Sequence, residues 1–292
     1  MRTLIKILVP MLGVLFGASC LQAQSLPGDI LVDSSFRVEF LFGSQAVRSA
    51  VRDVQNGGVD SDFLFRLDSK FDLPVLAGNV EVSPLRFISG RLAGLTSVLE
   101  QSGAIQRLTM LAPESVFNVK PAFNSWEVAG LGHLWNRDGY RFSVTAGYRQ
   151  ESWSLEGVGV PGSSGVNLSS RDDSAYYGPF LGMQTAVFFP WWKARCEFVG
   201  SPWMSRKMSG SVIRTDSFVT YNGWGHGGLL EVRVEGTMHL TRFVFAGVHG
   251  RYTFQESYGQ FIRKDSGLLT GQFDAYTNDS FAIVGLDLTF VF

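Results

Sequence analysis

The sequence predicts an all-β protein, a single antiparallel β-barrel of about ten strands that crosses a membrane. Three observations carry this prediction. Residues 281–292 alternate with a period of two, so that one face of the segment is uniformly apolar. Several other segments alternate in the same way and carry charged residues on their second face. Beyond the N-terminal segment the chain has no apolar run of the roughly eighteen residues that a membrane-spanning helix needs, so only strands could cross a membrane.

Ten segments have strand character, and they alternate with turns and loops. The strands are expected at 36–42, 63–71, 85–98, 126–135, 140–153, 176–189, 193–204, 229–240, 243–255 and 281–292. A turn is expected within 72–84, and long loops over 100–121, 157–174, 205–223 and 256–279. Residues 136–139 predict a tight hairpin because they contain an Asp-Gly pair. An even strand number would return both termini to the periplasm, with short inner turns and longer outer loops.

The charged faces of these strands are expected to line the lumen, because the apolar faces would meet lipid. The inward residues are Arg37, Glu39, Arg66, Glu127, Arg141, Glu231, Arg233 and Glu235. A soluble all-β fold would turn its apolar faces inward and could not also bury this many charges. A barrel of about ten strands is narrow, so we expect these side chains to plug the lumen; a charged ion path is the alternative. Which residues of 85–98 face the lumen stays open, because Arg86 and Arg91 are an odd number of residues apart and would point to opposite faces of the strand.

The first 23 residues read as a secretory signal peptide. Arg2 and Lys6 precede an apolar stretch over 7–16, and small residues follow it. We expect cleavage after Ala23, so that 24–292 forms one barrel domain. Cys20 lies in a sequence that faintly resembles a lipoprotein attachment box, and its lipidation stays open.

Composition and cysteine usage exclude several classes of protein. Hydrophobic residues make up 45% of the chain at a net charge of -1, which excludes disorder and gives no reason to expect nucleic acid as a partner. Only Cys196 remains after cleavage, so an intramolecular disulfide is impossible. The histidines show no metal-ligand spacing, so we assign no metal and no cofactor.

Residues 140–157, YRFSVTAGYRQESWSLEG, resemble the strand-five segment of the omptin family, with its Tyr-Arg pair, Ala-Gly-Tyr and Gln-Glu-Ser. Residues 93–96, residues 171–173 and Trp203 also fall where omptins have similar residues. This resemblance implies a barrel of the bacterial outer membrane. The terminal Phe292 is similar to the last residue of such barrels, and implies the barrel-assembly machinery as a partner.

Omptins are endopeptidases, and the resemblance implies an aspartate pair above the third strand and an Asp-His pair above the seventh. Here 98–104 contains only Glu100 as an acid, and 205–209 contains neither aspartate nor histidine. A general base must lie within hydrogen-bond reach of its water. We therefore expect the omptin fold without its peptidase mechanism.

Two sets of residues are weaker candidates for a site. Asp60, Asp62, Asp216 and His226 could form a substitute water-activating group, although solvated loop acids are the simpler interpretation. Arg206 and Lys207 beside Trp203 could meet lipopolysaccharide phosphates at the outer rim; an ordinary solvated loop is the alternative.

Three functions remain open at this point. The sequence favours a non-enzymatic surface, envelope or ligand-binding barrel, ahead of a narrow channel and of a hydrolase with a non-standard site. It names no ligand, substrate or oligomeric state.

Overall fold

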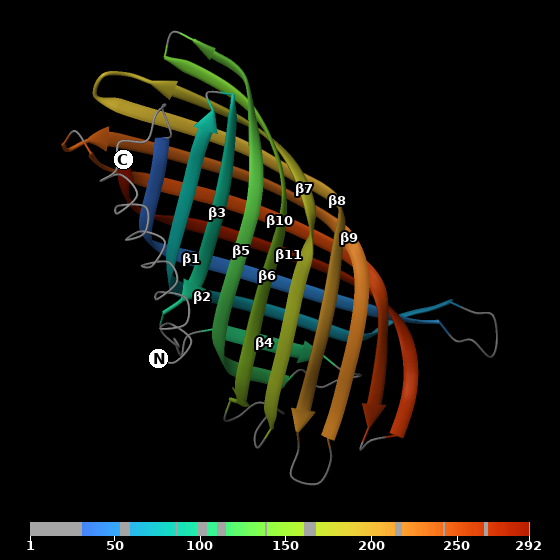
Figure 1. Ribbon diagram of the computed structural model, residues 1–292. Helices are drawn as coiled ribbons and strands as arrows, with labels where there is room; N and C mark the ends of the chain where they lie inside the picture. Colours follow the sequence, from blue (N-terminus) through green and yellow to red (C-terminus); the bar gives the residue numbers. More distant parts are fainter. Residues whose placement is uncertain are drawn as a thin grey trace.

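The computed structural model describes residues 31–52, 59–85, 87–98, 104–109, 115–137, 139–160, 168–213, 218–241, 243–265 and 268–291. All regular structure in these ranges is strand, and eleven strands form one ring of antiparallel neighbours (Figure 1). They are β1 (Leu31–Arg52), β2 (Val59–Leu85), β3 (Ile88–Ser97), β4 (Ala104–Thr109), β5 (Ser115–Arg137), β6 (Tyr140–Gly159), β7 (Ser169–Phe188), β8 (Trp192–Ile213), β9 (Phe218–His239), β10 (Val244–Asp265) and β11 (Leu268–Val291). Within the described ranges no helix is long and apolar enough to pass through a bilayer. The signal segment 1–23 with Cys20, and Phe292, lie outside the described residues.

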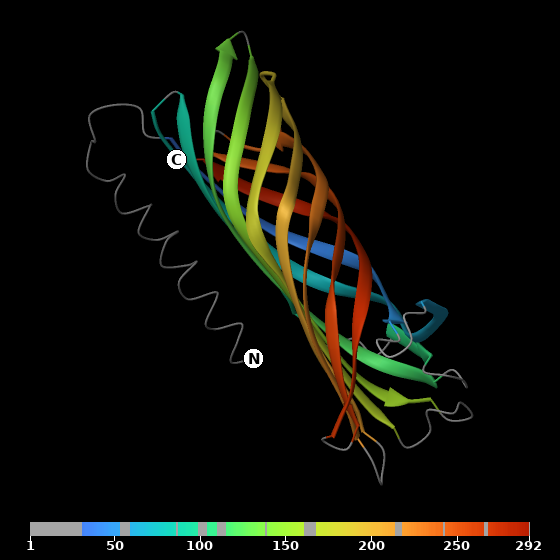
Figure 2. The same cartoon turned by 90° about the vertical axis from the view of Figure 1, so that its right-hand side faces the viewer.

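The ring closes because β1 pairs with both β11 and β2. β3 and β4 share one place in it, since both lie between β2 and β5, one beyond the other along the same path. The eleven strands therefore occupy ten positions, eleven less the one that β3 and β4 share. This confirms the predicted all-β barrel of about ten strands, whose strands are steeply inclined to the long axis (Figure 2).

The strands are longer than the sequence predicted. β2 runs without interruption from Val59 to Leu85, so the turn expected within 72–84 is wrong. β4 and the start of β5 fall inside the loop expected over 100–121. β10 and β11 leave only 266–267 between them, where a loop over 256–279 was expected. In the missed parts polar outward side chains such as Asp72, Glu256 and Gln260 interrupt the apolar ones, so strand pairing continues there without the regular apolar alternation that signals it.

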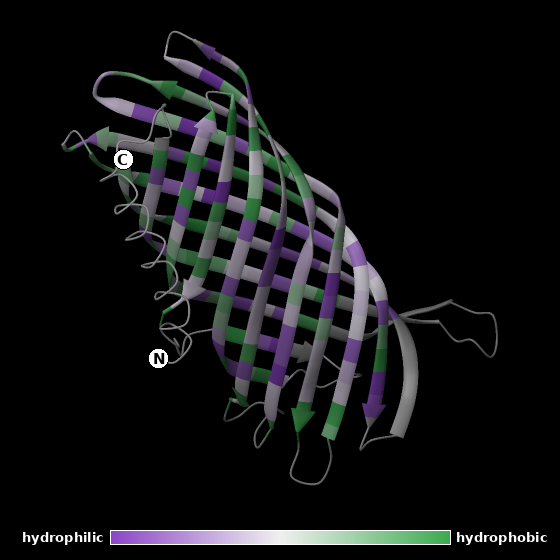
Figure 3. Ribbon diagram, viewed as in Figure 1, coloured by the Kyte–Doolittle hydropathy of each residue, from purple (hydrophilic) through white to green (hydrophobic). Residues whose placement is uncertain are grey.

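Hydropathy alternates along the strands (Figure 3). The exposed large apolar side chains, such as Leu134, Leu230 and Leu286, form an apolar band on the outer wall. Two sets of outward aromatic residues, each at least 40% exposed, bound it: Trp135, Tyr140 and Trp192 at one end, and Trp126, Tyr148 and Trp203 at the other. We call the first end proximal and the second distal. The proximal hairpin turns at Gly139 with a φ of 74°, a conformation that favours glycine, which confirms the predicted turn. Such a band with aromatic borders is typical of lipid-facing barrel surfaces.

Beyond the distal aromatic residues the wall continues with polar outward side chains, among which Trp224 and Tyr258 are also exposed. Its outward side chains include Ser152, Ser154, Asp173, Lys207 and Ser209. The distal part of the barrel therefore rises out of the apolar band, and the lumen there lies outside the membrane-spanning segments.

Candidate functional site in the barrel lumen

The middle of the lumen holds an ion-pair network of four arginines and four glutamates. Its members are Arg91, Glu127, Arg149, Glu151, Glu197, Glu231, Arg233 and Arg251. Arg149 donates to Glu127 at 2.6 Å and to Glu231 at 2.7 Å, and Arg91 donates to Glu127 and Glu197 at 2.8 Å each. Equal numbers of the two charges and short contacts make this network electrically neutral.

Part of this network was predicted from the strand pattern. Glu127, Glu231 and Arg233 do face the lumen. Arg149 and Glu151 were missed, although they follow Arg141 at even spacing on the same strand and could have been found by extending its phase. The open phase around Arg91 is now fixed: Arg91 points inward and is 4% exposed.

The proximal lumen holds a second, looser set of ion pairs. Arg37 lies 3.4 Å from Glu235, and Glu39 lies 2.9 Å from His249. These three predicted inward residues are confirmed, as is Arg141, which lies over the Phe188 ring at 5.1 Å. The side chain of Arg66 lies outside the described part.

His133 is a structural histidine in the same region. Its Nε2 lies 2.7 Å from Ser89 Oγ and its Nδ1 lies 2.7 Å from Ser143 Oγ, so both ring nitrogens are hydrogen-bonded. Within the described residues no three His, Cys, Asp or Glu side chains converge as a metal site requires.

Aromatic rings separate the central network from the distal lumen. Phe123 and Trp153 stack at 6.5 Å, and Phe281 meets both rings at 5.5 and 5.2 Å. On β6, which runs toward the distal end, Trp153 comes two residues after Glu151. On β11, which runs in the opposite direction, Phe281 comes before the residues at the level of the ion pairs, so it also lies on their distal side. The rings therefore form a layer across the narrow lumen directly distal to the ion pairs.

A polar layer lies on these rings and is built around Arg206 of β8. Its guanidinium donates to Ser174 Oγ and to Tyr176 Oη, both at 3.0 Å, and lies 3.1 Å from Asp279. Tyr176 continues the layer to Thr277 at 3.2 Å. Gln45 of β1 joins Arg206, at 2.9 Å, to Asp172 of β7, at 3.2 Å, once its amide is oriented to satisfy both contacts. We call these residues and Tyr221, whose hydroxyl bonds to Asp172, the distal polar layer.

Buried apolar side chains cap this layer on its distal side. They include Val47, Leu67, Phe117, Val119, Leu155, Met208 and Val212. Buried side chains thus occupy the described lumen at four successive levels distal to the looser proximal set: ion pairs, aromatic rings, a polar layer and an apolar cap.

The structure does not bring the other candidate residues together. His226 lies on the outward face of β9, with its ring against Trp224 at 5.4 Å, and so points away from the lumen. Asp216 and the side chains of Asp60 and Asp62 lie outside the described part.

The pairing of Arg206 with Lys207 at the outer rim needs correction. Arg206 is 3% exposed and points into the lumen, while Lys207 points outward. Adjacent strand residues face opposite sides, so the two cations cannot meet one head group. β8 continues to Ile213, where a loop was expected from residue 205.

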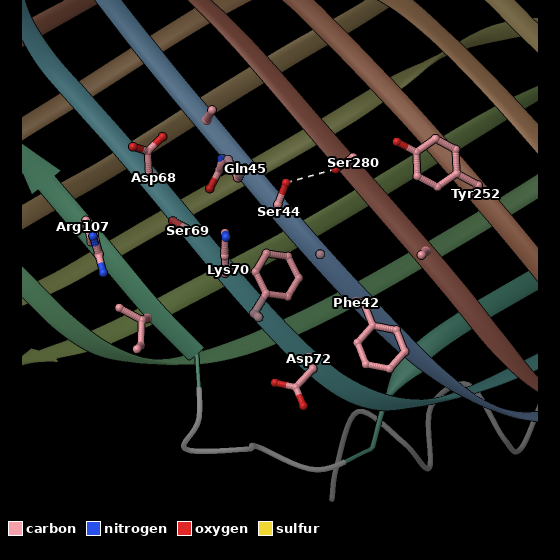
Figure 4. A pocket seen from close by; sticks show the side chains of 15 residues that line it. Phe42, Ser44, Gln45, Asp68, Ser69, Lys70, Asp72, Arg107, Tyr252 and Ser280 are labelled. Carbon is pink, nitrogen blue, oxygen red and sulfur yellow. Dashed lines mark hydrogen bonds between the residues drawn. The ribbon is translucent and has the colours of Figure 1, made fainter.

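A groove of about 830 Å³ crosses the outer wall over β4, β2, β1, β11 and β10 (Figure 4). Small side chains form its floor, and Ser44 Oγ lies 3.0 Å from Ser280 Oγ there. Phe42 and Tyr252 line the groove from the apolar band. Its charged lining is formed by Asp68, Lys70, Asp72 and Arg107. The groove therefore joins an apolar wall to a polar one.

The barrel is similar to solved outer-membrane proteins. The outer membrane protease OmpT from Escherichia coli superposes with a TM-score of 0.81 at 16% identity, over 92% of this chain and 99% of that chain. OprG from Pseudomonas aeruginosa gives 0.40 at 9% identity, over 88% of this chain and 95% of that one. A FadL homologue from the same organism gives 0.31 at 7% identity, over 89% and 90%.

The first of these likenesses confirms the omptin-like fold expected from residues 140–157, and at this identity it shows the fold alone. No protein-family model matches the chain. No curated protein matches it either.

Proposed function

We propose that this chain is an integral outer-membrane barrel with a non-proteolytic surface or envelope role. One combined observation carries the proposal: an apolar outer band with aromatic borders encloses a lumen filled by neutralised ion pairs and an apolar cap. A barrel built to pass solutes would keep a wet path, whereas here the inward charges bind one another at hydrogen-bond distance.

The inward residues of β8 support the non-proteolytic part of the proposal. The omptin mechanism would need an acid and an imidazole at this level, but the inward positions hold Met204, Arg206 and Met208. A thioether and a permanently charged guanidinium cannot take a proton from water. Fold similarity without these groups carries no chemistry.

Orientation and partners are part of the same proposal. Both termini would lie in the periplasm, and the signal segment would be removed. Phe292 would be recognised by the barrel-assembly machinery. The distal, polar part of the wall would then face the cell exterior, next to lipopolysaccharide. Lys207, outward and opposite the exposed Trp224 of β9, and Lys70 in the outer groove are suited to its phosphates, because a cation near an interfacial aromatic fits an anionic head group.

Cell fractionation with a gel assay tests the proposal. The full precursor, expressed with its signal, is expected in the outer-membrane fraction, starting at Gln24 and migrating differently on a gel before and after boiling. A species recovered in the soluble periplasm, with the same mobility in both lanes, would overturn it.

A further inference from the structure

The distal polar layer has an imbalance of charge. Arg206 is the one guanidinium at its centre, and two carboxyl groups face it, Asp279 from β11 and Asp172 from β7. All three side chains are at most 3% exposed. One guanidinium can neutralise one carboxylate, so a second carboxylate would remain an uncompensated buried charge.

The contacts of the two carboxyls show the same imbalance. Asp172 Oδ1 accepts no hydrogen bond from the described residues, and neither oxygen of Asp279 accepts one of regular geometry. A neutral carboxyl group needs fewer hydrogen bonds than a carboxylate and can itself donate one. The arrangement therefore favours a layer in which one carboxyl carries a proton.

The other groups around the pair do not remove the imbalance. The titratable or charged groups that act on the two carboxyls are Tyr176 of β7, Arg206 of β8, Tyr221 of β9, Glu151 of β6 and, for Asp172, its outward neighbour Asp173. β1 and β10 contribute the neutral Gln45, Gln255 and Ser257. Glu151 adds negative charge, and neither tyrosine ionises near neutral pH.

The pKa values of both carboxyls are raised. Burial raises the pKa of Asp172 to about 7; Arg206 opposes the rise and Asp279 adds to it. Burial raises the pKa of Asp279 to about 6, again against the effect of Arg206. The adjacent Asp173 points outward; burial raises its pKa, but hydrogen bonds with Arg171 and Ser154 and the charge of Arg171 together hold that pKa below the usual value.

We propose that the distal polar layer is a proton switch, in which Asp172 and Asp279 hold a proton around Arg206 and loosen the apolar cap above them when both ionise. The layer is compact at mildly acidic pH, because Arg206 then balances the single carboxylate. At higher pH the second carboxylate is buried without a counter-charge, and hydration of the layer from the distal mouth relieves it. The switch concerns the closure of the lumen, and it does not depend on the proposed outer-membrane role.

The sign of the effect follows from proton linkage. The folded barrel retains protons that the unfolded chain, with an ordinary aspartate pKa of 3.8, has already lost. The stabilising contribution is therefore complete below pH 3.8 and is lost as pH rises through about 6 and about 7. Between pH 6 and 7 the folded barrel holds about one proton that the unfolded chain does not hold. The folding equilibrium constant is therefore expected to fall roughly tenfold over that pH unit.

Asp172→Asn tests the switch, with Asp173→Asn as the matched control on the next residue. Each refolded protein is unfolded in urea at pH 6, 7 and 8. Wild type and D173N are expected to lose stability as pH rises, while D172N stays nearly flat. An equal slope in D172N, or a flat wild type, would overturn the proposal.

A second measurement keeps the proposal testable if D172N fails to fold. Infrared spectra of wild type at pH 5.5 and 8 are expected to differ by the carbonyl band of a protonated carboxyl, which D173N keeps and Asp279→Asn alters. No such band in wild type at pH 5.5 would refute a shared proton.

Discussion

Replacing Glu231 by alanine should destabilise the barrel strongly, because this carboxylate connects three strands of the lumen. It lies on β9, is 2% exposed, and accepts hydrogen bonds from Arg149 of β6 and from Arg251 of β10, at 2.7 Å each. Arg233 on its own strand and Thr253 on β10 also donate to it. Few other side chains in the described residues have so many charged partners.

The size of the effect follows from what each arginine keeps. Arg149 and Arg233 retain Glu127, and Arg251 retains Glu151. None is left alone, but the network gains one uncompensated positive charge inside the lumen. Breaking a buried ion pair usually costs 3–5 kcal/mol, so the remaining partners place the expected loss near the lower end, about 3 kcal/mol.

Urea unfolding of the protein refolded in lipid vesicles, followed by tryptophan fluorescence, measures this loss. Glu231→Gln should fall between wild type and alanine, since it keeps the shape and an acceptor but not the charge. Glu156→Ala is the matched control: its partner Arg171, at 3.0 Å, is exposed, so no measurable change is expected. If E231A were as stable as E156A, the lumen would have to be hydrated, and the argument for a closed barrel would fail.

Two further predictions follow from the filled lumen and from the inward residues of β8. Purified protein in planar bilayers should give no steady conductance, because ion pairs, rings and an apolar cap fill the described lumen; stable, ion-selective steps would contradict this. Refolded protein should not cut a peptide with basic sites, since Arg206 and two methionines occupy the inward positions; cleavage that His226→Ala abolishes would contradict the non-proteolytic assignment.

The fold could be predicted because outward apolar residues reveal the strands within the band. The face of 281–292 that carries Val284, Leu286 and Leu288 does point outward, at 58%, 68% and 37% exposure. The distal strand halves could not be predicted in the same way. Around Asp173 and Lys207 both faces carry polar residues, so period-two alternation is lost although main-chain pairing continues.

The candidate site was predicted only in part, and for a related reason. Charged residues between apolar neighbours, such as Glu231, revealed their inward direction from the sequence. Arg206 did not, because it lies beside Lys207 and only the register of β8 shows which cation faces the lumen. The nearness of Asp172 to Asp279 could not be predicted at all, since it joins β7 to β11 across the lumen rather than along neighbouring strands.

In this architecture a shared fold need not bring shared chemistry, and the reason is physical. Main-chain hydrogen bonds between neighbouring strands close the ring, and they hold each strand in place whatever its inward side chains are. The inward positions are therefore free to change as long as their charges and volumes balance. At Met204, Arg206 and Met208 that balance is met by a guanidinium with carboxyl partners on β7 and β11 and by two thioethers, a combination that packs the lumen and places no acid-imidazole pair on β8. A barrel wall that superposes closely on a protease therefore does not by itself imply proteolysis, because main-chain ladders fix the wall whatever the inward side chains are.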